Sequence, residues 1–180
     1  MGEALFARIA KERAPLLSLW FDAALEGYAR DTASFLKDRR DPFANPVGHH
    51  TRRGLERLFD ELVGAMDMEA VTQALDPILR IRAVQNLTPG RAVEFLFRFK
   101  RILSERFGAA PRSAEAAGLL FELHERIDRM VLAAFDVYMA CREQVMELKA
   151  NEMRQRTFRA FQRAGLVRPE HEKAPEADGE

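Results

Sequence analysis

The stretch AEAAGLLFELHERIDRMVLAAFDVYMACREQVMELKANEMRQRTFRAFQRA, residues 114–164, decides the fold class. It has no proline and one glycine, and its apolar residues recur at spacings of three and four, as one face of an α-helix requires. Its first half is broadly apolar, which predicts packing against a helical body. Beyond Cys141 the same spacing meets mostly polar residues, which predicts a narrower seam that pairs with another chain. We expect this helix to dimerise through Leu120, Leu123, Ile127, Met130, Val137 and Leu148.

The rest of the chain is also expected to be helical. β-Branched residues are sparse, and the pairs Asn45–Pro46 and Thr88–Pro89 are typical helix starts. Asp67 and Ser113 are further candidate caps. We predict an all-α fold, globin-like or an up-down bundle of about six to seven helices with a long C-terminal helix. The expected helices before residue 114 cover about 3–13, 15–28, 31–37, 46–63, 68–86 and 89–107.

Composition excludes several classes of protein. Lys and Arg number 28, as do Asp and Glu, and a general nucleic-acid binder would show a basic excess. Cys141 is the only cysteine, so no internal disulfide is expected and a reducing cytoplasm fits. The N-terminus has no uninterrupted apolar region typical of a signal peptide. No run of 18 apolar residues occurs, so we expect no membrane insertion.

Charge patterning divides the chain near its end. Residues 149–168 are strongly basic, whereas 169–180 are acidic and almost without apolar side chains. Such a segment cannot bury enough apolar surface to fold. We therefore predict one sensor-like helical domain over residues 1–166 and a disordered acidic tail over 167–180.

The segment DPFANPVGHH, residues 41–50, combines turn residues with apolar ones. Asn45 and Pro46 predict a helix start, and we expect Phe43 to point inward as an apolar anchor. A ligand-gating loop is the alternative, because functional loops often combine such residues. His49 and His50 are adjacent, whereas two helical metal ligands favour positions four apart, so we expect no metal site.

The sequence shows no catalytic motif. No nucleophile elbow and no glycine-rich phosphate loop is present. His124 lies at the margin of the apolar stripe, and a haem ligand there is one alternative. The other is a boundary histidine hydrogen-bonded to Asp128 or Glu125. The sequence identifies no cofactor, and we expect none.

Two arginines in ALDPILRIRAVQ, residues 74–85, are candidates for a buried charge. Arg80 and Arg82 lie in an otherwise apolar helix that Pro77 should kink. One should face solvent, and the other should lie near the interior with a carboxylate such as Asp76 or Glu94. A structural ion pair and an anion or signal contact are both open at this point.

Three segments together resemble a known family. They are DPFANPVG (41–48), LDPILRIRAVQNLTP (75–89) and AVEFLF (92–97). They are similar to the N-terminal domain of RsbRD-type RsbT co-antagonists, on the residues Asn45–Pro46, Asp76–Pro77, Arg80, Arg82 and Thr88–Pro89.

The resemblance implies a non-enzymatic, cytoplasmic sensory or regulatory domain of the bacterial stressosome. In fuller members such a domain dimerises, and a long helix passes signals to a C-terminal STAS domain. No alternating β-α segment follows here, so we expect a stand-alone member without STAS. We expect a homodimer acting through a small ligand or a regulatory protein partner. A haem- or other cofactor-binding sensor, or an accessory subunit of a sulfur-metabolism complex, is the alternative.

Overall fold

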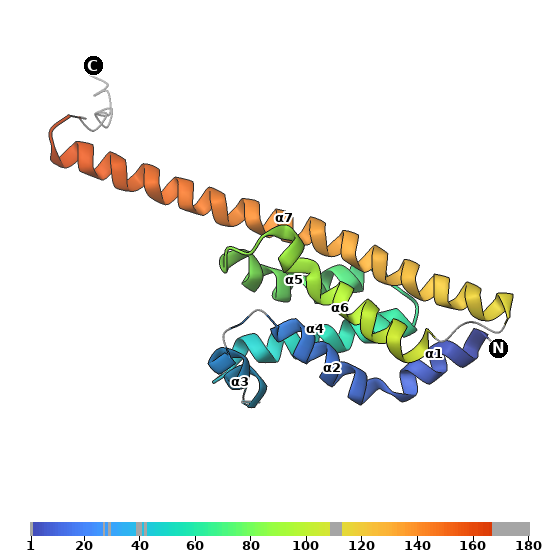
Figure 1. Ribbon diagram of the computed structural model, residues 1–180. Coiled ribbons are helices and arrows are strands. Elements are labelled where there is room, and N and C mark those ends of the chain that lie inside the picture. The colour runs from blue at the N-terminus through green and yellow to red at the C-terminus, as the bar shows by residue number, and fades with distance from the viewer. Residues whose placement is uncertain are drawn as a thin grey trace, which may run out of the picture. The chain divides into compact units, whose positions relative to one another are not determined.

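The computed structural model describes residues 2–26, 28, 30–38, 41, 43–108 and 113–166. The expected all-α class with a long last helix is confirmed (Figure 1). The predicted acidic tail, residues 167–180, lies outside the described residues. The helices are α1 (Gly2–Lys11), α2 (Arg13–Leu25), α3 (Arg30–Asp38), α4 (Pro46–Val63), α5 (Met68–Val84), α6 (Pro89–Phe107) and α7 (Ala114–Arg163).

Side-chain caps account for the starts of α4, α5 and α7. The Asn45 side chain accepts from the Gly48 N–H at 2.8 Å, and the Asp67 side chain accepts from the Glu69 N–H at 2.9 Å. The Ser113 hydroxyl accepts from the Ala116 N–H at 3.1 Å. These three predicted caps are confirmed. Thr88 precedes Pro89 as expected, but its side chain makes no capping bond.

The chain divides into two compact units, Met1–Arg142 and Glu143–Glu180. The first contains α1 to α6 and the part of α7 up to Arg142. Within it, α5 and α6 lie between that part of α7 and the layer of α2 and α4 (Figure 1). The described part of the second unit consists of the end of α7 and a short turn up to Leu166.

The core of the first unit is built around Trp20, which is fully buried. Its indole stacks on Phe99 with ring centroids 3.8 Å apart, and its Nε1–H donates to the Phe95 carbonyl at 3.0 Å. Because a buried indole N–H needs an acceptor, this bond fixes α2 against α6.

Helices α4 and α5 approach each other closely at Gly54. A Cβ atom at this position would lie 2.8 Å from the Ala74 carbonyl oxygen and 2.7 Å from the Ile78 Cδ1. Both distances are below van der Waals contact, so the approach requires glycine. Pro77 lies in the same part of α5, which continues unbroken from Met68 to Val84.

Helix α7 completes the core of the first unit. Arg126 on α7 donates to the carbonyls of Leu62 and Gly64 at the end of α4, at 2.9 and 2.8 Å. These carbonyls lack helical partners, so the guanidinium caps α4. The α7 side chains buried in this core are Leu123, Ile127, Met130, Ala134, Tyr138 and Cys141.

Candidate functional site

Arg82, near the end of α5, is the most buried charged side chain among the described residues, with 7% of its surface exposed. Its Nη2 donates to the Ala24 carbonyl at 2.8 Å, and its Nη1 donates to the Ala92 carbonyl at 3.1 Å. The guanidinium carbon lies 4.7 Å from the centre of the Phe95 ring. One side chain therefore connects α5 to the end of α2 and to the start of α6.

The carbonyl of Ala24 explains why an arginine is held here. It belongs to the last turn of α2, where carbonyl groups have no helical N–H partner and carry partial negative charge. The guanidinium donates a hydrogen bond to this carbonyl, but burial disfavours its charge and lowers the pKa of Arg82. An anion beside the guanidinium would compensate the buried charge.

The expectation that the buried arginine pairs with Asp76 or Glu94 is wrong. Asp76 pairs with the exposed Arg80 at 2.9 Å, and it raises the pKa of that arginine. Glu94 pairs with Arg98, also at 2.9 Å. Each carboxylate lies one helical turn from its partner, so both carboxylates pair with an arginine of their own helix and not with Arg82. The prediction that one of the two arginines is exposed and the other internal is confirmed.

A cavity of about 280 Å³ opens beside Arg82, and we refer to it as the Arg82 cavity. Tyr28 donates its hydroxyl to the Gln85 Oε1 at 3.1 Å on its wall. Arg91 is exposed and forms no ion pair with any described residue. The lining residues are Ala24, Glu26, Tyr28, Arg82, Gln85, Leu87, Arg91 and Glu94.

The same end of α5 is bonded to α7. The Tyr138 hydroxyl donates to the Leu87 carbonyl, and Arg142 Nη1 donates to the Ala83 carbonyl at 3.3 Å. Leu87 also lines the Arg82 cavity. A displacement of the α5 end would therefore act directly on α7 within the first unit.

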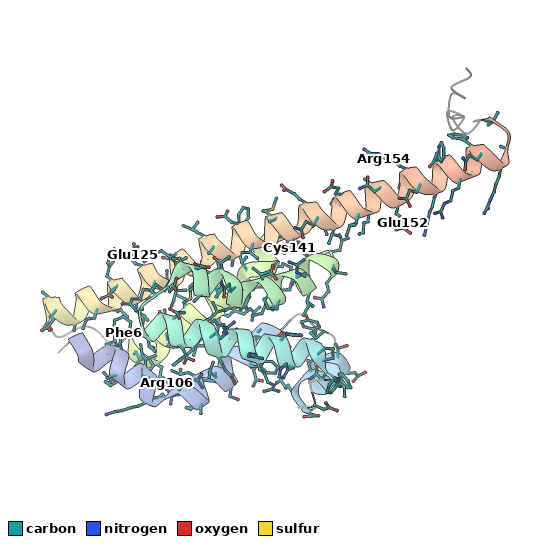
Figure 2. The ribbon with its side chains drawn as sticks, turned by 180° about the vertical axis from the view of Figure 1, so that it is seen from behind. Phe6, Arg106, Glu125, Cys141, Glu152 and Arg154 are labelled. Atoms are coloured by element: carbon teal, nitrogen blue, oxygen red, sulfur yellow. The ribbon has the colours of Figure 1, made fainter. Side chains whose placement is uncertain are left out.

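Cys141 lies on α7 beside α5 (Figure 2). Its Sγ is 3.9 Å from the Asp76 Oδ1, and 4% of its surface is exposed. Burial raises the pKa of the thiol, and the Asp76 carboxylate raises it further. A buried, protonated thiol is a poor nucleophile, so this site favours a packing role.

His124 contacts a residue that was not expected. Its Nε2 lies 3.0 Å from the Ser104 Oγ on α6, while Asp128 pairs with Lys100 at 2.7 Å. One of the two ring nitrogens that could ligate a haem iron is thus engaged in a hydrogen bond.

The two adjacent histidines lie in the first turn of α4. Their ring centroids are 5.8 Å apart in an edge-on arrangement, with His50 exposed. Across the described ranges, no group of three or more His, Cys, Asp or Glu side chains is placed to hold a metal ion.

The segment around Asn45 is an anchor, but not through Phe43. The expectation of an inward Phe43 is wrong, because 97% of its surface is exposed. Asn45 takes that role: it is 1% exposed, and its Nδ2 donates to the Leu36 carbonyl at 2.9 Å while its Oδ1 caps α4. A buried amide with both ends bonded fixes α3 against α4 more firmly than an apolar contact at a turn.

The residues expected on a dimer face differ in how far they are buried. Leu123, Ile127 and Met130 are at most 1% exposed, covered by the first unit itself. Leu120 and Val137 are partly buried against the same core, whereas Leu148 is 69% exposed.

Sequence reasoning missed Tyr28, Gln85 and Arg91 as neighbours of Arg82. Arg91 lies two residues after the predicted helix start at Pro89 and could have been noted as a cation in the first helical turn, where cations are unfavourable. The contact between Arg82 and Ala24 spans 58 residues, and no local pattern announces it.

Comparison with known proteins identified one family. The family model described as the RsbT co-antagonist protein rsbRD N-terminal domain matches residues 15–153, a range that includes every residue of the Arg82 cavity. No curated protein and no solved structure gave a match. Within the described ranges, no helix has the length and apolar character needed to cross a membrane.

Proposed function

Because the chain belongs to the RsbT co-antagonist rsbRD N-terminal domain family, we propose that it is a sensor whose input site is the Arg82 cavity. The family is regulatory and non-catalytic, of the stressosome type. The proposal adds that a small ligand enters this cavity, and that α7 carries the response to a second copy or a regulatory protein partner.

The observation that carries the proposal is the position of the cavity. Its walls come from α2, α5 and α6, and its Leu87 carbonyl accepts the Tyr138 hydroxyl of α7. An occupant therefore touches the point where four helices are bonded together. If these helices can pack in two arrangements, a ligand that binds one arrangement more tightly shifts the equilibrium toward it. The size of the shift is set by the difference between the two affinities.

The charges around the cavity favour an anionic ligand. Arg82 is a buried cation with no carboxylate paired to it among the described residues, and Arg91 is likewise unpaired. The two wall glutamates, Glu26 and Glu94, both pair with Arg98. A small carboxylate can accept hydrogen bonds from arginine. A volume of about 280 Å³ suits a molecule smaller than a typical drug.

The test is thermal unfolding with acetate, succinate and inorganic phosphate, using acetamide as the uncharged counterpart of acetate. We expect at least one of the anions to raise the Tm and acetamide to leave it unchanged, because ligand that binds only the folded state stabilises it. Arg91→Gln should abolish the shift. Arg101→Gln is the matched control, because Arg101 is an exposed arginine on the same helix, paired with Glu105 outside the cavity.

An equal response of Arg91→Gln and Arg101→Gln would place the ligand elsewhere. An equal response to acetate and acetamide would show that charge does not select the ligand. Either result would refute the anionic input site.

We also propose that the protein is a cytoplasmic homodimer that associates through the end of α7. The support is exposure: every described residue from Met146 to Leu166 is exposed, and several are large and apolar. Such an apolar face is a feature of interaction surfaces. Light scattering at tens of micromolar should give a mass above that of one chain, about 20.5 kDa. A strict monomer would contradict the dimer without affecting the input site.

A further inference from the structure

The second unit carries a continuous apolar stripe that the dimer-face prediction did not identify. Met146, Ala150, Met153, Thr157 and Phe161 follow one another at spacings of three and four along α7, so they share one face. Met146, Met153 and Phe161 are 54%, 70% and 46% exposed. Ala150, Met153, Thr157 and Phe161 line a shallow apolar depression together with Arg154 and Phe158.

Leu148 does not belong to this stripe. It precedes Met153 by five positions, which places it about 140° away around the helix. Extending the buried seam of the first unit by constant spacing leads to Leu148 and not to this stripe.

The charges of this segment are unequally distributed along it. Residues 143–152 carry Glu143, Glu147 and Glu152 against one cation, Lys149. Residues 153–163 carry four arginines, Arg154, Arg156, Arg159 and Arg163, and no acid. Glu152 and Arg154 mark the point where the sign changes, and they lie on opposite sides of the exposed helix (Figure 2).

We propose that residues 143–163 pair antiparallel with the same segment of a second copy, centred on Met153; this rests on the proposed homodimer. In a parallel pair, the four arginines of one helix would face the four arginines of the other. In an antiparallel pair, the arginine half of each helix faces the glutamate half of its partner. Like charges across a helix pair are repulsive and opposite charges attractive, so charge selects the antiparallel orientation.

The apolar stripe fits the same arrangement. Its members lie nearly symmetrically about Met153, so reversal of the partner brings Met146 opposite Phe161 and Ala150 opposite Thr157. Layers of two large side chains then alternate with layers of two small ones along the seam. The segment is thus complementary in charge to a reversed copy of itself, and the same reversal continues its apolar stripe, so a second copy is the partner we propose.

Cysteine crosslinking tests the orientation. In a Cys141→Ala background, single cysteines are placed at exposed stripe positions as Met146→Cys, Met153→Cys and Phe161→Cys. An antiparallel pair brings the two copies of residue 153 together, whereas the copies of residue 146 lie about 21 Å apart along the axis. With a short bis-maleimide, we expect Met153→Cys to crosslink to itself and Met146→Cys alone not to do so. A mixture of Met146→Cys and Phe161→Cys should give a mixed crosslink.

Salt provides a second readout. Attraction between opposite halves weakens as ions screen it, so dimer dissociation should increase when NaCl rises from about 0.05 M to about 0.5 M. Reversing one half alone, with Arg154→Glu, Arg156→Glu, Arg159→Glu and Arg163→Glu, should also weaken association. Adding Glu143→Arg and Glu147→Arg to the same chain should restore it, because the two halves then have exchanged signs.

The outcomes separate this inference from the homodimer itself. A dimer by light scattering in which Met146→Cys and Phe161→Cys each crosslink to themselves is parallel and overturns the orientation alone. A dimer that none of the three cysteines crosslinks uses another surface and also overturns it. A monomer by light scattering would refute both the proposed homodimer and the antiparallel orientation.

Discussion

Replacing Gly54 with alanine tests the close approach of α4 and α5 that positions the Arg82 end of α5. Two effects oppose each other. Alanine is a better helix former than glycine by about 1 kcal/mol in a helix interior, which stabilises the variant. The new Cβ would lie 2.8 Å from the Ala74 carbonyl oxygen, a backbone atom that cannot rotate away.

The size of the clash decides whether Gly54→Ala stabilises or destabilises the protein. Ordinary van der Waals contact begins near 3.4 Å, so the two helices must separate by several tenths of an ångström. Inserting a methyl-sized group into a packed contact costs about 1–3 kcal/mol. We therefore expect Gly54→Ala to lower the free energy of unfolding by about 1 kcal/mol, with the upper limit near 2 kcal/mol after the helix gain is subtracted.

Gly118→Ala is the matched control. Gly118 lies inside α7, and a Cβ at that position meets no atom within 4 Å. That variant should gain most of the helix preference, about 0.5–1 kcal/mol. Urea unfolding followed by circular dichroism measures both. If the two variants are stabilised equally, α4 and α5 do not approach as closely as described, and the reasoning fails.

Two further predictions concern stability. Asn45→Ala should lower the free energy of unfolding by about 1–2 kcal/mol, because it removes the cap of α4 and leaves the buried Leu36 carbonyl without its amide donor. Phe43→Ala should change the free energy of unfolding by less than about 0.5 kcal/mol, because Phe43 is exposed. If urea unfolding shows comparable losses for the two variants, Phe43 is an anchor after all. Burial raises the pKa of Cys141 above its ordinary 9.0, so the unfolded thiol ionises before the folded one. The stability from the protonated thiol is present below about pH 9 and lost as pH rises through the folded pKa. Cys141→Ala should therefore flatten the alkaline part of the stability profile, and an unchanged profile would assign the loss to other groups.

Helix caps could be predicted correctly because a cap and its partner are close together in the sequence. Asn45, Asp67 and Ser113 cap helices through bonds to residues two or three positions away, so the sequence contains both partners. The pair Arg80 and Arg82 is similar: residues two apart on a helix point in very different directions, so one exposed and one buried arginine could be predicted.

Errors arose where a side chain had several partners within reach. His124 bonds to Ser104 on another helix, although Asp128 lies one turn away. Asp128 is engaged by Lys100, which no spacing rule relates to it. The inward position assigned to Phe43 is occupied by the polar Asn45 instead, because the end of α3 supplies a carbonyl that an amide donor can satisfy and a phenyl ring cannot.

The sequence by itself determined the all-α class, most helix starts, the long last helix and the family, because helix periodicity, capping and motif residues depend on near neighbours. Only the tertiary structure decided what surrounds Arg82. The carbonyl of Ala24, the ring of Phe95 and the cavity beside them come from three helices, and a carbonyl group is present at every position of every sequence. Packing alone selects which of these carbonyls is left without a helical partner and faces the arginine.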